Sequence, residues 1–239
     1  MKPVSLALAF VVMLLSRPGH CAEQLVSSAH YANGEAIPYI LTTGGDAPKF
    51  VSILMPGGVG RLLPHMEDGK LRFLAGGNFL IRSRGLFADD DFAAVSTDAT
   101  GSAERMQAIV DDVHSRFPEA QIFIVGTSRS TLSTMQLAEP LDGKVAGFIH
   151  TSSMDGIYWF DTRNFKSRHL MVFHRDDSCR STHPASAQHA HEKFGTPLIV
   201  MEGGISTGDA CEAAAHHGYN GIEQETVSRI KTWIRGELP

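Results

Sequence analysis

Residues 121–138 read QIFIVGTSRSTLSTMQLA, and two different periodicities meet inside this stretch. Residues 122–125 are β-branched and aromatic, which is the composition of a strand that is buried on both faces. After Ser130, apolar side chains recur at helical spacing, and no proline or glycine interrupts them. The stretch therefore predicts a strand, a tight turn over residues 126–130 and a helix.

The predicted turn, Gly126-Thr127-Ser128-Arg129-Ser130, has a serine at its centre. A side chain at such a turn is exposed at the carboxyl end of a sheet, beside the backbone N–H groups that begin the next helix. This geometry suits a nucleophile. It also requires small residues two positions away on either side, a requirement that Gly126 meets fully and Ser130 nearly meets. An ordinary helix N-cap is the alternative interpretation of Ser128.

The composition of the chain is that of a globular protein. It has 239 residues, of which 43% are hydrophobic and 20% are charged, so it can bury a sizeable core. This length is common for a single α/β domain. The net charge is −5 at pH 7, and lysine and arginine do not cluster, so we do not expect nucleic acid to be a partner.

The first 22 residues have the pattern of an export signal. Lys2 provides a positive end, residues 4–15 form an apolar run, and residues 17–19 (RPG) interrupt it. The run is too short to span a bilayer, which takes about 20 apolar residues. We therefore expect a cleaved signal over residues 1–22, with an uncleaved anchor as the alternative. Residues 23–239 are then a single exported domain, periplasmic or secreted, without stable membrane insertion.

Export changes the interpretation of the three cysteines. Cys21 belongs to the signal, which leaves Cys179 and Cys211. In an oxidising compartment two remaining cysteines most simply form a disulfide, and two buried thiols are the alternative. No cysteine and histidine spacing indicates zinc. His189 and His191 are two positions apart, so on a helix they would not share a face, and we expect neither a metal nor a cofactor.

Further strand and helix patterns alternate along the chain. Apolar runs typical of strands occupy residues 25–29, 38–42, 50–55, 92–97, 145–150, 170–174 and 197–201. Helical patterns occupy residues 103–117, 184–194 and 222–236. This alternation predicts an α/β fold with a doubly wound, mainly parallel sheet and helices on both faces. The segment between the strands at 145–150 and 170–174 is too short for a large cap domain.

Connection rules place the loops that follow parallel strands along one edge of the sheet. One of them is Pro56-Gly57-Gly58-Val59-Gly60, whose glycines let the backbone turn its N–H groups toward a ligand. It lacks the lysine and the glycine spacing of phosphate-binding loops, so an oxyanion-binding loop fits better than they do. A plain glycine-rich turn is the alternative.

The region that follows, residues 61–90, has no clear periodicity. It contains Arg82 and Arg84 between apolar segments, and we expect these two cations to pair with carboxylates rather than to hold an acidic substrate.

Two later loops complete a catalytic set. Residues 174–180 contain Asp176 and Asp177, and residues 211–221 contain histidines. Together with Ser128 they supply a nucleophile, an acid and a base in the chain order Ser, Asp, His. All three are needed, because a serine hydroxyl is a poor nucleophile until an imidazole takes its proton, and a carboxylate must hold that imidazole in the right tautomer.

These residues resemble the α/β-hydrolase family over roughly residues 36–236. The turn around Ser128 is similar to the family's nucleophile elbow, with Ser130 in place of the usual final glycine, and the 56–60 loop is similar to its oxyanion loop. The resemblance implies that Ser128 is the nucleophile, His217 the general base and Asp177 its orienting acid. It also implies oxyanion donors at the backbone N–H groups of Arg129 and of Gly58 or a loop neighbour.

Two of these roles remain open at the level of sequence. Asp176 and Asp155 compete with Asp177 as the acid. His216 competes with His217, which is favoured because Gly218 directly after it allows a tight turn into the last helix.

The function that the resemblance implies is hydrolysis of small-molecule ester or acyl substrates through an acyl-enzyme, with amides or thioesters less favoured. Tyr158 and Trp159 are expected to line the substrate pocket, or else to pack under their loop. A non-catalytic binding protein on a hydrolase scaffold is the alternative function. The sequence does not specify the acyl preference or the oligomeric state.

Overall fold

The computed structural model describes residues 22–237. The expected export signal therefore lies outside the described residues, except for its last residue, Ala22. Within the described part, no helix combines the length and the apolar character needed to cross a membrane.

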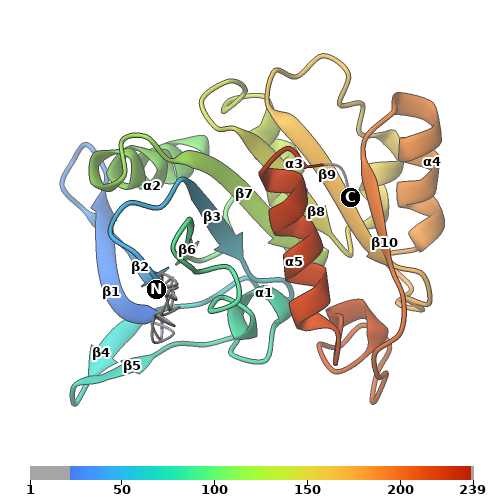
Figure 1. Cartoon of the computed structure of the whole chain (residues 1–239), viewed down its shortest axis with the longest axis horizontal. Helices are drawn as coiled ribbons and strands as arrows, with labels where there is room; N and C mark the ends of the chain where they lie inside the picture. The colour runs from blue at the N-terminus through green and yellow to red at the C-terminus, as the bar shows by residue number, and fades with distance from the viewer. Residues whose placement is uncertain (1–21, 238–239) are drawn as a thin grey trace, which may run out of the picture.

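The centre of the molecule is an eight-stranded sheet with the order β1-β2-β6-β3-β7-β8-β9-β10 (Figure 1). Its strands are β1 (Glu23–His30), β2 (Ala36–Thr43), β3 (Phe50–Met55), β6 (Phe92–Ser96), β7 (Gln121–Thr127), β8 (Gly147–Thr151), β9 (Arg168–His174) and β10 (Leu198–Met201). The β1–β2 and β2–β6 pairs are antiparallel, and every other pair is parallel. The predicted fold class, a doubly wound and mainly parallel α/β sheet, is confirmed.

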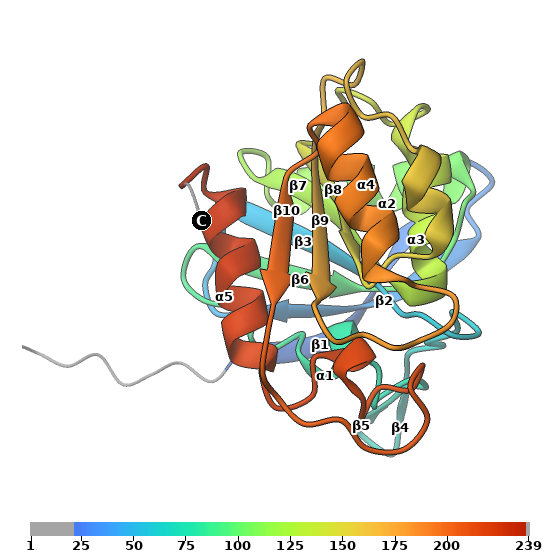
Figure 2. The ribbon, with the colours of Figure 1, turned by 90° about the vertical axis from the view of Figure 1, so that its right-hand side faces the viewer.

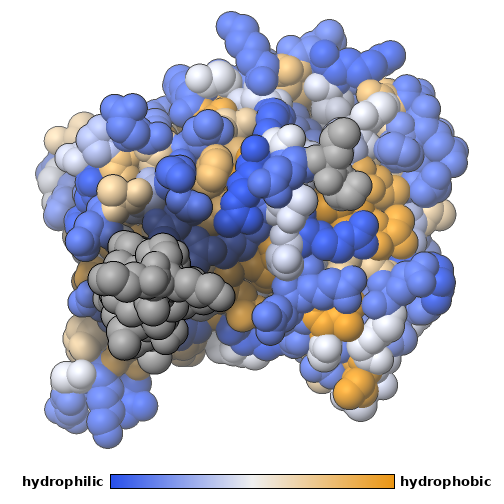
Figure 3. All heavy atoms as spheres, viewed as in Figure 1, coloured by the Kyte–Doolittle hydropathy of each residue, from blue (hydrophilic) through white to orange (hydrophobic). Residues whose placement is uncertain are grey.

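Helices cover both faces of this sheet (Figure 2). One face carries α2 (Ala103–Arg116), α3 (Thr131–Ala138) and α4 (Pro184–Phe194), and the other carries α1 (Phe79–Arg82) and α5 (Glu223–Ile234). Figure 3 shows the side on which α5 lies, where hydrophilic side chains predominate between scattered hydrophobic ones.

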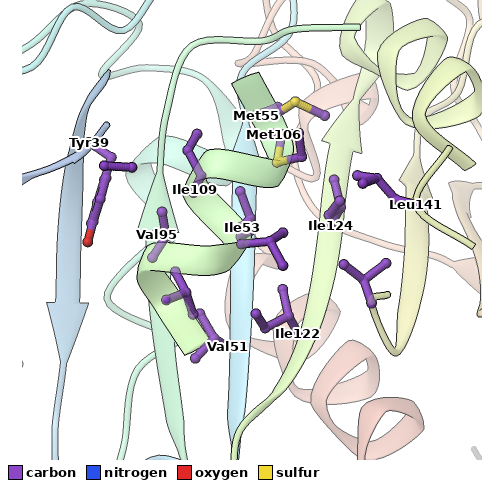
Figure 4. Close-up of a cluster of buried hydrophobic side chains, with 14 of the residues drawn as sticks. Tyr39, Val51, Ile53, Met55, Val95, Met106, Ile109, Ile122, Ile124 and Leu141 are labelled. Carbon is purple, nitrogen blue, oxygen red and sulfur yellow. The ribbon is translucent and has the colours of Figure 1, made fainter. Parts of the chain in front are cut away.

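The central strands are mostly apolar because both of their faces are covered. In β3, Val51 and Ile53 contribute to the core beneath α2, whereas Leu54 contributes to the core beneath α1 and α5. Figure 4 shows the first of these cores, in which Met106 and Ile109 of α2 pack against the sheet. This double burial explains why the strand runs are clear in the sequence.

Residues 61–90, which show no periodicity, contain elements that are too short to produce one. They form a two-stranded hairpin of β4 (His65–Glu67) and β5 (Lys70–Arg72), followed by the four-residue α1. Arg82 is half-buried and pairs with Glu223, as expected. Arg84 pairs with no carboxylate among residues 22–237; its guanidinium donates instead to the Ile81 carbonyl and the Gln24 amide oxygen.

Between β8 and β9 the chain forms only a short 3-10 helix, η2 (Asp155–Trp159), and the surrounding loops. The described residues therefore include no large cap domain over the carboxyl edge of the sheet. The loops at this edge are left open, and two of them contain further 3-10 turns, η1 (Ser128–Ser130) and η3 (His216–Gly218).

Candidate active site

Ser128 stands at the sharp turn between β7 and α3. Its backbone φ is +53°, a left-handed value that is uncommon for a residue with a side chain, while Thr127 before it is still extended. A Cβ at Gly126 would lie 2.8 Å from both the Ser130 carbonyl oxygen and Thr134 Cγ2. Glycine is therefore required at this position, because α3 returns so closely over the end of β7.

Ser130, the residue that departs from the usual elbow pattern, is buried and forms hydrogen bonds that a glycine could not. Its hydroxyl accepts the Thr127 N–H at 2.8 Å and donates to the Met55 carbonyl at 2.8 Å. Met55 is the last residue of β3. The hydroxyl thus ties the Ser128 turn to the start of the 56–60 loop.

The 56–60 loop lies directly against Ser128. A Cβ at Gly57 would lie 2.8 Å from the Thr127 carbonyl oxygen and 3.1 Å from Ser128 Cβ, so only glycine allows this approach. Gly58 has a φ of +62° and lines the same cavity as Ser128 and Arg129. The two residues expected to supply oxyanion donors are therefore beside the expected nucleophile.

The Asp177 carboxylate is fully buried and engaged on both oxygens. Its Oδ1 accepts the Cys179 N–H at 2.9 Å. Its Oδ2 accepts the Thr182 hydroxyl at 3.1 Å and lies 2.9 Å from Nδ1 of His217. These contacts hold the carboxylate in a single orientation.

His217 is the middle residue of η3, the turn that precedes α5, and only 6% of its side chain is exposed. Because Nδ1 faces the Asp177 carboxylate, the neutral ring carries its proton on Nδ1 and leaves a lone pair on Nε2. His217 and Ser128 line one cavity, which is the arrangement needed for a base and a nucleophile. Among the described residues no hydrogen bond joins the two side chains.

The competing aspartates have other partners. Asp176 is exposed and pairs with Arg175, whose hydrogen bond lowers the pKa of the Asp176 carboxyl. Asp155 lies 2.7 Å from Nδ1 of His183 and accepts the His183 N–H, so it joins η2 to the start of α4. Of the three aspartates, only Asp177 contacts His217 in the described chain.

The competing histidine, His216, points elsewhere. Its ring stacks on His174 with 4.3 Å between the centroids. His174, Asp176 and His216 could offer metal-ligand atoms within 4.8 Å of one another. Both ring nitrogens of His174 are already engaged, however, because Nδ1 accepts the Asp176 N–H and Nε2 lies 2.7 Å from the Gly203 carbonyl oxygen. This engagement argues against a metal centre here.

Several residues that hold the His217 loop have no signature in the sequence. The Ser152 hydroxyl donates to the His217 carbonyl at 2.8 Å, and the Tyr219 hydroxyl donates to the Val172 carbonyl at 2.7 Å. Burial raises the pKa of the Tyr219 phenol above its ordinary value, so it stays protonated as a donor. Each of these contacts joins positions that are more than 40 residues apart, which is why local pattern does not reveal them.

Cys179 and Cys211 form a disulfide. It links the loop of Asp177 to the segment that precedes His217, and both half-cystines line the cavity. The bond therefore restrains the two loops that supply the acid and the base, as a precise site requires.

The cavity has a volume of about 790 Å³. Beside the polar residues already described, its larger apolar side chains are Val59, Phe79, Leu132 and Met154. The charged side chains among its lining residues are Arg129 and Glu212.

Tyr158 and Trp159, which were expected to line the substrate pocket or to pack under their loop, are not among the residues that line this cavity. Tyr158 stacks on His189 of α4, with 3.6 Å between the ring centroids. Trp159 is 72% exposed, with Lys193 Nζ 5.2 Å from its ring. Their 3-10 turn packs beside α4, held there by Asp155, so the aromatic pair lies outside the cavity that Ser128 lines.

No protein-family model matches this chain, and no curated protein matches it by sequence. Solved structures do match it. A dienelactone hydrolase from Anabaena variabilis aligns with a TM-score of 0.63 and 11% identity, over 92% of this chain and 100% of the hydrolase. An esterase from Pyrococcus furiosus aligns with a TM-score of 0.61 and 10% identity, over 98% of this chain and 96% of the esterase. An α/β serine hydrolase without a lid, from Xanthomonas campestris, aligns with a TM-score of 0.57 and 12% identity, over 87% and 95% of the two chains.

Proposed function

We propose that this chain, whose fold is that of the α/β hydrolases, is a serine hydrolase that cleaves esters through an acyl-enzyme intermediate. The proposal rests on the buried contact between Asp177 and His217, together with the cavity that His217 and Ser128 both line. A fold alone does not determine an activity, so the proposal rests on these three side chains.

In this mechanism the Ser128 hydroxyl attacks the ester carbonyl carbon while Nε2 of His217 takes its proton. Asp177 holds the imidazole and stabilises its protonated form. The backbone N–H groups of Gly58 and Arg129 receive the oxyanion. His217 then protonates the departing alcohol, and a water molecule activated by the same ring releases the acid from Ser128. Loss of one oxyanion donor typically costs about 3 kcal/mol of transition-state stabilisation.

The cavity supports a preference for small esters with apolar acyl groups. Its apolar walls suit an acyl chain, and no large cap covers it in residues 22–237. Amides and thioesters are less favoured substrates. We also propose that the chain is exported, because its first 22 residues have the pattern of a signal and a Cys179–Cys211 disulfide suits an oxidising compartment.

One observation favours the alternative, a binding protein without catalysis. No hydrogen bond joins Ser128 to His217 in the described structure, and a catalytic pair must reach that contact when substrate binds. Catalytic hydrogen bonds often tighten only in the complex, so the esterase remains the proposal.

Chromogenic esters of increasing acyl length test this function on the purified mature protein. We expect hydrolysis that is lost by about 1,000-fold or more in Ser128→Ala, because the covalent route needs the hydroxyl. Circular dichroism of the variant checks that it remains folded. A folded wild-type protein that hydrolyses no ester in the panel supports the binding protein instead.

A further inference from the structure

Asn78 lies at the start of α1, on the wall of the Ser128 cavity. α1 lies at the same end of the molecule as the turn into α5, although the two are far apart in the sequence (Figures 1 and 2). Asn78 lies in residues 61–90, where the sequence has no clear pattern, and no role follows from its surroundings in the chain. Its side chain nevertheless accepts a hydrogen bond from α1 and lies beside the 56–60 loop.

The orientation of the Asn78 amide is determined by the helix that it caps. Its Oδ1 accepts the Leu80 N–H at 3.2 Å. An amide has one oxygen and one nitrogen, so fixing the oxygen on Leu80 turns Nδ2 and its two protons to the opposite side.

On that side lie the 56–60 loop and the elbow. The point that a Gly57 Cβ would occupy is 3.5 Å from Asn78 Nδ2 and 3.1 Å from Ser128 Cβ. The amide nitrogen and the nucleophile carbon therefore flank the same small gap, which stays open because residue 57 is glycine. In the described structure, Nδ2 donates to no acceptor, whereas the amide oxygen is engaged.

The segment around Asn78 is also tied to the loop of the expected base. The Arg82 guanidinium donates to the Gly77 carbonyl and to the Gly218 carbonyl, each at 2.6 Å. It also forms a 2.9 Å salt bridge with Glu223. Gly77 and Gly218 directly adjoin Asn78 and His217, so one planar cation holds the two loops at a fixed separation.

We propose that Asn78 is a catalytic residue whose Nδ2 donates a hydrogen bond to the oxyanion, in addition to the N–H groups of Gly58 and Arg129. This inference rests on the proposed serine hydrolase function and adds a side-chain donor to it. A preorganised donor of this kind stabilises charge that develops only in the transition state, so it acts on kcat more than on KM.

Three substitutions separate the donor from the cap. Asn78→Ser keeps a hydroxyl that can accept the Leu80 N–H but removes the donor that faces Ser128. Asn78→Asp keeps the same acceptor and turns a carboxylate oxygen toward the oxyanion. Asn78→Ala removes both functions. The measurements are kcat and KM for one ester, the thermal midpoint, and the affinity of a boronic acid, which forms a tetrahedral anion on an active-site serine.

We expect Asn78→Ser to retain the wild-type midpoint within about 2 °C, because it preserves the cap. Its kcat should fall about 10- to 100-fold at nearly constant KM. Asn78→Asp should lose more activity than Asn78→Ser at a similar midpoint, because its charge repels the oxyanion. Boronic acid affinity should fall in parallel with kcat in both variants.

An active wild-type enzyme whose kcat and boronic acid affinity are unchanged in Asn78→Ser and Asn78→Asp would overturn this role while leaving the serine hydrolase intact. Loss of thermal stability in Asn78→Ala alone would then identify the residue as a helix cap only. A wild-type protein that neither hydrolyses esters nor binds the boronic acid would instead overturn the proposed function, and the Asn78 role with it.

Discussion

Nδ1 of His217 lies 2.9 Å from Oδ2 of Asp177, and the two side chains are 6% and 0% exposed. The Thr182 hydroxyl lies 3.1 Å from the same carboxylate oxygen and 3.2 Å from the same ring nitrogen. Forty residues separate the acid from the base along the chain, so this contact depends on the tertiary fold. With water excluded from the pair, the carboxylate acts on the imidazole with little screening.

Replacing Asp177 with asparagine should reduce kcat about 1,000- to 10,000-fold, because an amide at this position can no longer hold His217 in the tautomer with its lone pair on Nε2. Asp176→Asn is the matched control. Asp176 adjoins Asp177 but is exposed and paired with Arg175, so its loss should change kcat about twofold at most. Ester hydrolysis kinetics of both variants check this. A large loss of kcat in Asp176→Asn, with activity retained in Asp177→Asn, would contradict the assignment of Asp177 as the acid and indicate Asp176 instead.

Ser130→Ala should destabilise the protein by about 1–3 kcal/mol, because it removes the buried partner of the Thr127 N–H and of the Met55 carbonyl. The control is Ser133→Ala in α3, a partly exposed serine whose hydroxyl makes no side-chain hydrogen bond in the described structure. It should change stability by less than about 0.5 kcal/mol. Urea unfolding measures both. Equal midpoints for the two variants would contradict the structural role given to the Ser130 hydroxyl.

Removing the disulfide in the double variant Cys179→Ala, Cys211→Ala should lower stability by about 3–4 kcal/mol, since the two half-cystines are 32 positions apart and their link restricts the unfolded chain. For a chain of this length that corresponds to roughly 10 °C in the thermal midpoint. Reductant should lower the wild-type midpoint similarly and leave the variant unchanged. Thiol titration of the unfolded, unreduced protein that finds both cysteines reactive would show that the bond does not form.

Stability should fall as the pH drops from about 6.5 toward 4. Burial lowers the pKa of His169 to about 4, against a weaker raising effect of Asp142, and burial together with the neighbouring His169 lowers the pKa of His150 well below its usual value. The unfolded chain therefore binds more protons than the folded chain in this range, which makes the free energy of unfolding rise with pH. His169 alone should account for a loss on the order of 3 kcal/mol by pH 4.

Urea unfolding at several pH values measures this slope. The control is His169→Asn. In the wild type, Nδ1 of His169 lies 3.3 Å from Nε2 of His150, and asparagine keeps a polar atom near this position but has no titratable side chain. The stability of this variant should depend less on pH than that of the wild type. The same slope in both proteins would show that the buried His169 ring is not a source of acid sensitivity.

The sheet could be predicted from the sequence because most of its strands are buried on both faces and are therefore apolar along their length. The turn at Ser128 was also predictable, since a strand pattern meets a helix pattern there within a few residues. The resemblance to the α/β hydrolases, together with the chain order Ser, Asp, His, indicated Asp177 and His217 as acid and base, and in the structure their side chains are in contact.

Other features depend on contacts that no local pattern encodes. Asp176 and Asp177 are adjacent and chemically identical, and only the course of the loop determines which one faces the imidazole. Tyr158 and Trp159 could pack over the cavity or against α4. The Asp155 carboxylate accepts hydrogen bonds from the His183 N–H and the Ser186 hydroxyl at the start of α4, and these bonds hold the aromatic turn beside that helix. The role of Thr182 depends on its contact with His217, 35 residues away, as well as on its hydrogen bond to Asp177 in its own loop.

The most direct test of the account is the position of a covalent label. A fluorophosphonate should react with the folded wild-type protein, and peptide mass spectrometry should place the adduct on Ser128. The adduct should be absent from Ser128→Ala, strongly slowed in His217→Gln and unchanged in His216→Gln, because only His217 contacts Asp177. A folded wild-type protein that takes no label, or takes it at a residue other than Ser128, would contradict the account.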